Sequence, residues 1–114
     1  MTIEELVRDF GYKVITGSAE DLKHPVKGVY ACDLLSHAMA KVNSGDLWIT
    51  IHTNINVVAV ASLTDAACVL IPEGIAVEPQ TVERAAEKGV VILSSPSTTA
   101  QVCHEVLSMI GMKS

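Results

Sequence analysis

The sequence contains few aromatic residues: one Trp, one Phe and two Tyr in a chain of 114 residues, or 4%. Hydrophobic residues nevertheless make up 49% of the chain, and charged residues make up 18%. A chain of this length buries enough apolar surface to fold without disulfides or metal ions. The composition therefore predicts one domain over residues 1–114, with a core of Val, Ile, Leu and Ala.

Positive charge is also scarce. Eight Lys and Arg residues stand against 13 Asp and Glu residues, which gives a net charge of −5 and an isoelectric point near 5.2. The eight cations are scattered along the chain, whereas nucleic-acid binding requires clustered Lys and Arg to neutralise phosphates. DNA and RNA are therefore excluded as expected partners.

The three cysteines, Cys32, Cys68 and Cys103, lie far apart inside apolar runs. An odd number at such spacings suits reduced core thiols better than a disulfide framework. A nucleophilic cysteine would need a nearby base or helix start to lower the pKa of its thiol, and Cys32, just before Asp33, is the best placed for that role.

The chain has no uninterrupted apolar run of about 18 residues, and its first residues lack the basic and apolar regions of a signal peptide. We therefore expect a cytoplasmic protein that does not associate with a membrane.

Metal and catalytic motifs are missing as well. The four histidines, His24, His37, His52 and His104, show no i, i+4 pairing and no Cys-x-x-Cys companion, so neither a metal nor a cofactor is expected. His52 could act as a general acid or base at a strand end, but no nucleophile or carboxylate flanks it. The sequence favours a protein that is not an enzyme.

Short apolar runs alternate with segments of helical periodicity. Helices are predicted near 3–10, 34–42, 54–63, 79–88 and 97–110, and strands near 12–15, 26–32, 47–51, 68–71 and 90–93. Asp33 is predicted to cap the second helix and Asn54 the third. This order predicts an α/β fold with three layers, in which helices cover both faces of a mostly parallel sheet of about five short strands.

Polar residues follow two of the predicted strands, at the points where helices begin. Ligands of such folds bind beyond the carboxyl ends of the strands, and free amides at helix N-termini suit an anion. The alternative is that these residues only cap their helices, and neither junction has the glycine spacing of a phosphate-binding loop. The candidate ligand-binding residues are Thr50, His52, Thr53, Asn54, Ser95, Ser97 and Thr98.

Almost the whole chain resembles the DRTGG domain family. The resemblance spans about residues 12–104, and its landmarks are Val14 to Gly17, Val29 to Leu35, Gly45 to Thr50, Asn54 to Ala61 and Ala85 to Val90. These small α/β modules occur alone, beside CBS domains in some inorganic pyrophosphatases, and within some phosphotransacetylases. The chain is similar, more distantly, to the N-terminal domain of HPr kinase/phosphorylase.

The Asp-Arg-Thr-Gly-Gly run that names the family is not present. Thr53-Asn54 stands where relatives place an Asp-Arg pair, and Pro72-Glu73-Gly74 stands where a Gly-Gly turn would follow the next strand. The resemblance implies an accessory regulatory module that forms homodimers, sometimes in proteins that sense adenine nucleotides.

We therefore expect a homodimeric regulatory module that binds a small anionic ligand, such as a nucleotide. Its high hydrophobicity also suits shared apolar surface. The alternative is an accessory subunit that docks on a metabolic or redox enzyme.

Overall fold

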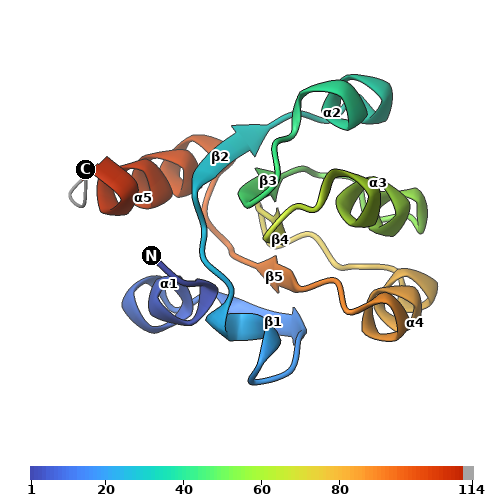
Figure 1. The fold of residues 1–114 in the computed structure, drawn as a ribbon, viewed down its shortest axis with the longest axis horizontal. Coiled ribbons are helices and arrows are strands. Elements are labelled where there is room, and N and C mark those ends of the chain that lie inside the picture. Colours follow the sequence, from blue (N-terminus) through green and yellow to red (C-terminus); the bar gives the residue numbers. More distant parts are fainter. Residues whose placement is uncertain (112–114) are drawn as a thin grey trace.

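The middle layer of the protein is a five-stranded sheet, seen in a computed structural model that describes residues 1–111 (Figure 1). The last three residues of the predicted domain lie outside the described range. The order of the strands is β1-β5-β4-β3-β2. Neighbouring strands are parallel, except that β1 runs antiparallel to β5 at one edge. The strands are β1 (Lys13–Thr16), β2 (Gly28–Ala31), β3 (Asp46–Ile49), β4 (Cys68–Ile71) and β5 (Ile92–Ser94).

Helices form the two outer layers. Figure 1 shows α2, α3 and α4 on one face of the sheet and α1 and α5 on the other. The helices are α1 (Ile3–Phe10), α2 (Leu35–Lys41), α3 (Asn56–Thr64), α4 (Pro79–Lys88) and α5 (Thr99–Gly111), with a short 3-10 helix, η1 (Asp21–Lys23). The predicted three-layer α/β fold is confirmed.

Strand register separates the core into two clusters. Trp48 pairs with Tyr30 on β2 and with Val69 on β4, and Val69 pairs with Ile92. Side chains of one such row point to the same face, and here they pack under α2, α3 and α4. The alternate residues, such as Leu47 and Leu70, pack under α1 and α5. Both faces of β3 and β4 are therefore buried.

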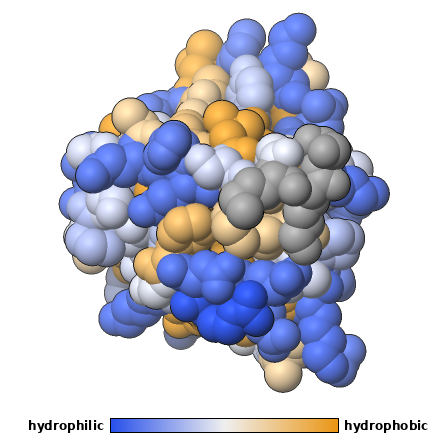
Figure 2. Space-filling model, turned by 90° about the vertical axis from the view of Figure 1, so that its left-hand side faces the viewer, coloured by the Kyte–Doolittle hydropathy of each residue, from blue (hydrophilic) through white to orange (hydrophobic). Residues whose placement is uncertain are grey.

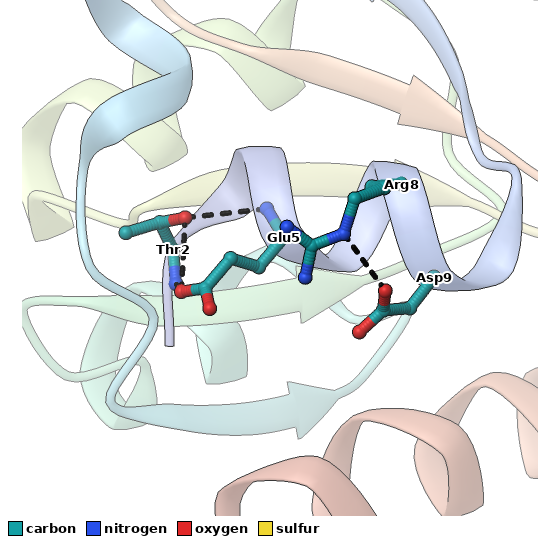
Figure 3. A network of polar contacts seen from close by, with 4 residues as sticks. All are labelled: Thr2, Glu5, Arg8 and Asp9. Carbon is teal, nitrogen blue, oxygen red and sulfur yellow. Dashed lines mark hydrogen bonds and ion pairs between the residues drawn. The ribbon is translucent and has the colours of Figure 1, made fainter.

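The helix α1 begins with the predicted capping box (Figure 3). The amide of Glu5 donates to Thr2 Oγ1 at 3.2 Å, and the amide of Thr2 donates to Glu5 Oε1 at 2.9 Å. Gly11 ends the helix in the left-handed conformation, with φ of 70°. Arg8 and Asp9 form an exposed ion pair on the same helix. Figure 2 shows that polar side chains cover much of the face that carries α1 and α5, with apolar side chains visible between them.

Several predicted boundaries are wrong. The helix α3 begins at Asn56, two residues later than predicted, because Asn54 Oδ1 accepts from the amide of Asn56 in a turn that precedes the helix. Its N-cap is Ile55, so the prediction of Asn54 as the cap is wrong. The strand β5 begins at Ile92 and not at Val90, because the amide of Val90 donates to Ala85 O and so belongs to the end of α4.

None of the helices within residues 1–111 is both long and apolar enough to span a membrane.

We expect Thr2→Ala to lower the free energy of unfolding by about 1 kcal/mol, because it removes the capping oxygen. Thr2→Ser keeps this oxygen and should retain most of the stability. Urea unfolding measures both, with Ser108→Ala on the exposed face of α5 as the control. Equal stability of Thr2→Ala and the unsubstituted protein would show that the capping box contributes nothing.

Candidate functional site

The carboxyl ends of the four parallel strands meet at one edge of the sheet. The loops after them, residues 32–34, 50–55, 72–78 and 95–98, form what we call the carboxyl edge. All seven predicted ligand-binding residues belong to its second and fourth loops. The parallel arrangement thus brings together residues that are more than 40 positions apart in the sequence, such as Thr50 and Ser97.

The two junctions flank the end of β4. The amide of Thr50 donates to Leu70 O at 3.2 Å, and the amide of Ser95 donates to Ile71 O at 3.0 Å. Thr50 and Ser95 are both buried, with 1% and 4% of their surfaces exposed. These two residues therefore form the floor of the carboxyl edge, one on each side of β4.

Asp33 has a different role from the one predicted. Its Oδ1 accepts from the Thr50 hydroxyl at 3.0 Å and from the amide of Ile51 at 2.9 Å. The N-cap of α2 is instead Leu34, whose side chain cannot accept a hydrogen bond. Asp33 therefore joins the loop after β2 to the loop after β3, and its prediction as a helix cap is wrong.

Most of the predicted polar groups form internal hydrogen bonds. Thr50 Oγ1 accepts from the amide of His52 at 3.2 Å, and Ser95 Oγ accepts from the amide of Ser97 at 3.1 Å. Thr98 forms a capping box with Gln101 at the start of α5: the amide of Gln101 donates to Thr98 Oγ1 at 3.2 Å, and the amide of Thr98 donates to Gln101 Oε1 at 3.0 Å.

Other donors of the carboxyl edge remain open toward solvent. Within residues 1–111, the imidazole of His52, the side-chain amide nitrogen of Asn54 and the hydroxyl of Ser97 form no hydrogen bond. The hydroxyl of Thr53 lies 3.4 Å from Glu78 Oε2, a long contact. These four residues are the members of the predicted set whose side-chain donors are least engaged within the protein.

The charges at this edge are mostly negative. Asp33, Glu73 and Glu78 belong to its loops, and Lys13 lies beside Ser94 through the pairing of β1 with β5. An anionic ligand here would depend on neutral donors and helix N-termini, because the nearby carboxylates oppose its charge.

Two of the three cysteines are poorly suited to act as nucleophiles. Burial raises the pKa of Cys68, which is inaccessible, and burial also raises the pKa of Cys103, so both thiols stay protonated at neutral pH. The more exposed Cys32 donates weakly to Leu34 O at 3.5 Å. Within residues 1–111, no group of three His, Cys, Asp or Glu residues is arranged to hold a metal ion.

Three grooves lie away from the predicted site. One, of about 230 Å³, runs between α3 and α4 and is lined by Ile55, Leu63 and Arg84 among others. The other two adjoin each other at the opposite edge of the sheet, beside His24 and Asp65. No local pattern in the sequence predicts these grooves, because their lining residues come from segments that only the tertiary structure brings together.

We expect Asp33→Ala to lower the free energy of unfolding by about 1–3 kcal/mol, because the buried Thr50 hydroxyl and the Ile51 amide lose their acceptor. Asp33→Asn keeps Oδ1 as an acceptor and should cost less. Urea unfolding measures both, with exposed Glu83→Ala on α4 as the control. An Asp33→Ala protein no less stable than the control would contradict this role for Asp33.

Comparison with known proteins identifies the family of this chain. A comparison with curated protein sequences found no match. Among solved structures, the chain is similar to the CBS and DRTGG domains of the regulatory region of Clostridium perfringens pyrophosphatase, complexed with its activator diadenosine tetraphosphate. The TM-score is 0.76 at 12% sequence identity, and the match covers 93% of this chain but 46% of that chain, or about half its length. The model of the DRTGG domain matches residues 5–109, and the chain therefore belongs to the DRTGG domain family.

Proposed function

We propose that this chain is a non-catalytic regulatory module that binds a small anionic ligand, such as an adenine nucleotide, at its carboxyl edge. We further propose that it acts as a homodimer in the cytoplasm. The family assignment supports a regulatory role, because the similar pyrophosphatase domains form part of a regulatory region that is complexed with a nucleotide activator.

The observation that carries the proposed site is the pair of junctions on either side of β4. Asn54 and His52 present open donors on one side, and Ser97 presents its hydroxyl on the other. The helix α5 begins beside Ser97; in its first turn the amide of Gln101 already donates to Thr98 Oγ1, and the amides of Thr99 and Ala100 have no acceptor within residues 1–111. A ligand between the junctions can therefore receive hydrogen bonds from both sides.

This geometry also indicates how such a ligand is held. Neutral donors provide the contacts, and the loops of the carboxyl edge carry Asp33, Glu73 and Glu78 without a Lys or Arg of their own. Because salt screens the repulsion between an anion and these carboxylates, binding here should not weaken as salt rises.

We expect Thr53→Ala combined with Ser97→Ala to weaken the binding of ATP by about tenfold, because two hydrogen bonds of about 0.5–1.5 kcal/mol each are lost. Isothermal titration calorimetry of the purified protein measures the dissociation constant. The control pair, Ser62→Ala with Ser108→Ala, removes two exposed hydroxyls elsewhere. An unchanged dissociation constant for Thr53→Ala with Ser97→Ala would rule out this site.

The outer face of α3 favours association with another protein. Val57, Val58 and Val60 face the core, yet Ile55 and Leu63 are exposed on the other side, Leu63 by 74%. A helix that is apolar on all sides is usually buried, so this face suits a protein contact. In the leading proposal, a second copy of the chain contacts this face. In the alternative, a metabolic or redox enzyme contacts it, and the chain is an accessory subunit of that enzyme.

We expect the unsubstituted protein to sediment as a dimer and Leu63→Glu to weaken the dimer by at least about tenfold, because a carboxylate would replace an apolar contact. Analytical ultracentrifugation measures both. Leu107→Glu on α5, 53% exposed in the unsubstituted chain, is the matched control. A protein that is monomeric before any substitution would overturn the homodimer and favour the docking subunit.

A further inference from the structure

The edge of the sheet opposite the carboxyl edge contains two adjoining grooves. Their volumes are about 260 Å³ and 140 Å³, so together they reach the size of the smaller small-molecule sites, roughly 300 Å³. We call this region the amino edge, because its loops, residues 24–27, 43–45, 65–67 and 89–91, precede the parallel strands. The residues common to both grooves are His24, Asp65, Ala66 and Ala67.

Three basic side chains line these grooves. Lys27 lines the larger one, Lys88 lines the smaller one, and His24 lines both. Within residues 1–111, none of the three has a carboxylate partner within 4.0 Å, whereas Arg8, Lys23 and Arg84 each form an ion pair elsewhere. Among residues 1–111, Lys13 and Lys41 also lack such a partner, so two of the four unpaired lysines of this acidic chain lie at this edge.

The local backbone fixes the position of Lys27. Its amide donates to Gly45 O at 2.9 Å, and its aliphatic stem lies against Gly45. A Cβ at Gly45 would come within 2.9 Å of Lys27 Cδ, and the φ of Gly45 is 86°, which side chains rarely tolerate. Glycine at this position therefore allows the stem of Lys27 to lie along the groove.

The carboxylate that lines both grooves already has a partner. Asp65 Oδ2 accepts from the hydroxyl of Ser44 at 2.6 Å, and Asp65 O accepts from the amide of Gly45 at 3.0 Å. Asp65 therefore serves to join the loop after α3 to the loop before β3. Its negative charge remains at the grooves, where Lys27 and Lys88 outnumber it.

The usual role of lysine at the end of a helix explains part of this arrangement. Lys88 is in the last turn of α4, where it offsets the negative end of the helix dipole. The terminal carbonyls of α3 and α4 are also satisfied by the left-handed caps at Asp65 and Gly89. Lys27, however, lies on the segment between η1 and β2, so no helix end accounts for its position.

We propose that the two grooves form a second ligand site, for a small anion with at least two negative charges of the pyrophosphate type. Lys27 and Lys88 hold the charged groups from the two ends of the site, and His24 donates a hydrogen bond between them. This site is independent of the one at the carboxyl edge, because the two share no residue and lie at opposite ends of the parallel strands.

The test is a titration of the 15N-labelled full chain with inorganic pyrophosphate, followed by amide NMR spectra. The expected result is that the amides of Gly45, Ala66 and Gly89 shift together, and that the affinity falls as salt rises, because charged groups provide the contacts. Amides of Thr53 and Ser97 report on the carboxyl edge in the same spectra, so failure of one site is distinguishable from failure of the other.

Matched charge variants test the two lysines. We expect Lys27→Gln with Lys88→Gln to weaken binding roughly tenfold or more, because two charge-assisted contacts are lost. Lys13→Gln with Lys41→Gln removes the same charge from positions that line neither groove, and should have a much smaller effect.

Three results would overturn the proposal. They are equal weakening by the two double variants, the absence of shifts at Gly45, Ala66 and Gly89 at about 10 mM pyrophosphate, and shifts of these amides with a Glu-rich peptide but not with pyrophosphate. A parallel titration with ATP shows whether the site recognises phosphate groups alone or a whole nucleotide. Equal affinities of ATP and pyrophosphate support recognition of the phosphates alone, and tighter binding of ATP at the same amides supports a nucleotide.

Discussion

The burial of β3 and β4 on both faces is the constraint on which the rest of the structure depends. Trp48 and Val69 need a helical layer on one side, and Leu47 and Leu70 need another on the opposite side. Parallel strands require crossover connections, and α2, α3 and α4 supply both the connections and one of the layers. The same crossovers gather all loops that follow the parallel strands at one edge and all loops that precede them at the other.

The two edges differ in chemistry. At the carboxyl edge, Asp33 holds two loops together and the open donors are neutral groups such as Asn54 and Ser97. At the amino edge, Lys27 and Lys88 have no carboxylate partner among residues 1–111. A module with two such edges can respond to a ligand at one end of its sheet while the other end and the outer face of α3 remain available for further contacts. This separation suits a regulatory role without catalysis.

Local signals in the sequence predicted much of the fold. The Thr2 capping box, Pro79 at the start of α4 and the apolar run of β4 each appear at the predicted position, because each depends on neighbours in the chain. The prediction of Asp33 as a helix cap is wrong, because its partners Thr50 and Ile51 lie in the loop after β3 and are brought to it by the sheet. The antiparallel pairing of β1 with β5 also required the tertiary structure.

The candidate sites, too, could be predicted from the sequence only in part. The sequence predicted that Thr53 and Ser97 lie at one edge of the sheet, because the loops that follow parallel strands meet there. It could not show that the hydroxyls of Thr50 and Ser95 form hydrogen bonds within the protein. The amino edge could not be predicted, because only packing brings the segments that carry Lys27 and Lys88 to the same edge of the sheet.

The measurement that tests the regulatory, ligand-binding role most directly is a thermal-shift screen of the purified protein against nucleotides, pyrophosphate and phosphorylated metabolites. A ligand at ~100 times its dissociation constant stabilises the folded state by about 2.7 kcal/mol, which raises the melting temperature by several degrees for a domain of this size. The account predicts such a rise with at least one of these anions. An unchanged melting temperature across the whole panel, at millimolar concentrations, would contradict it.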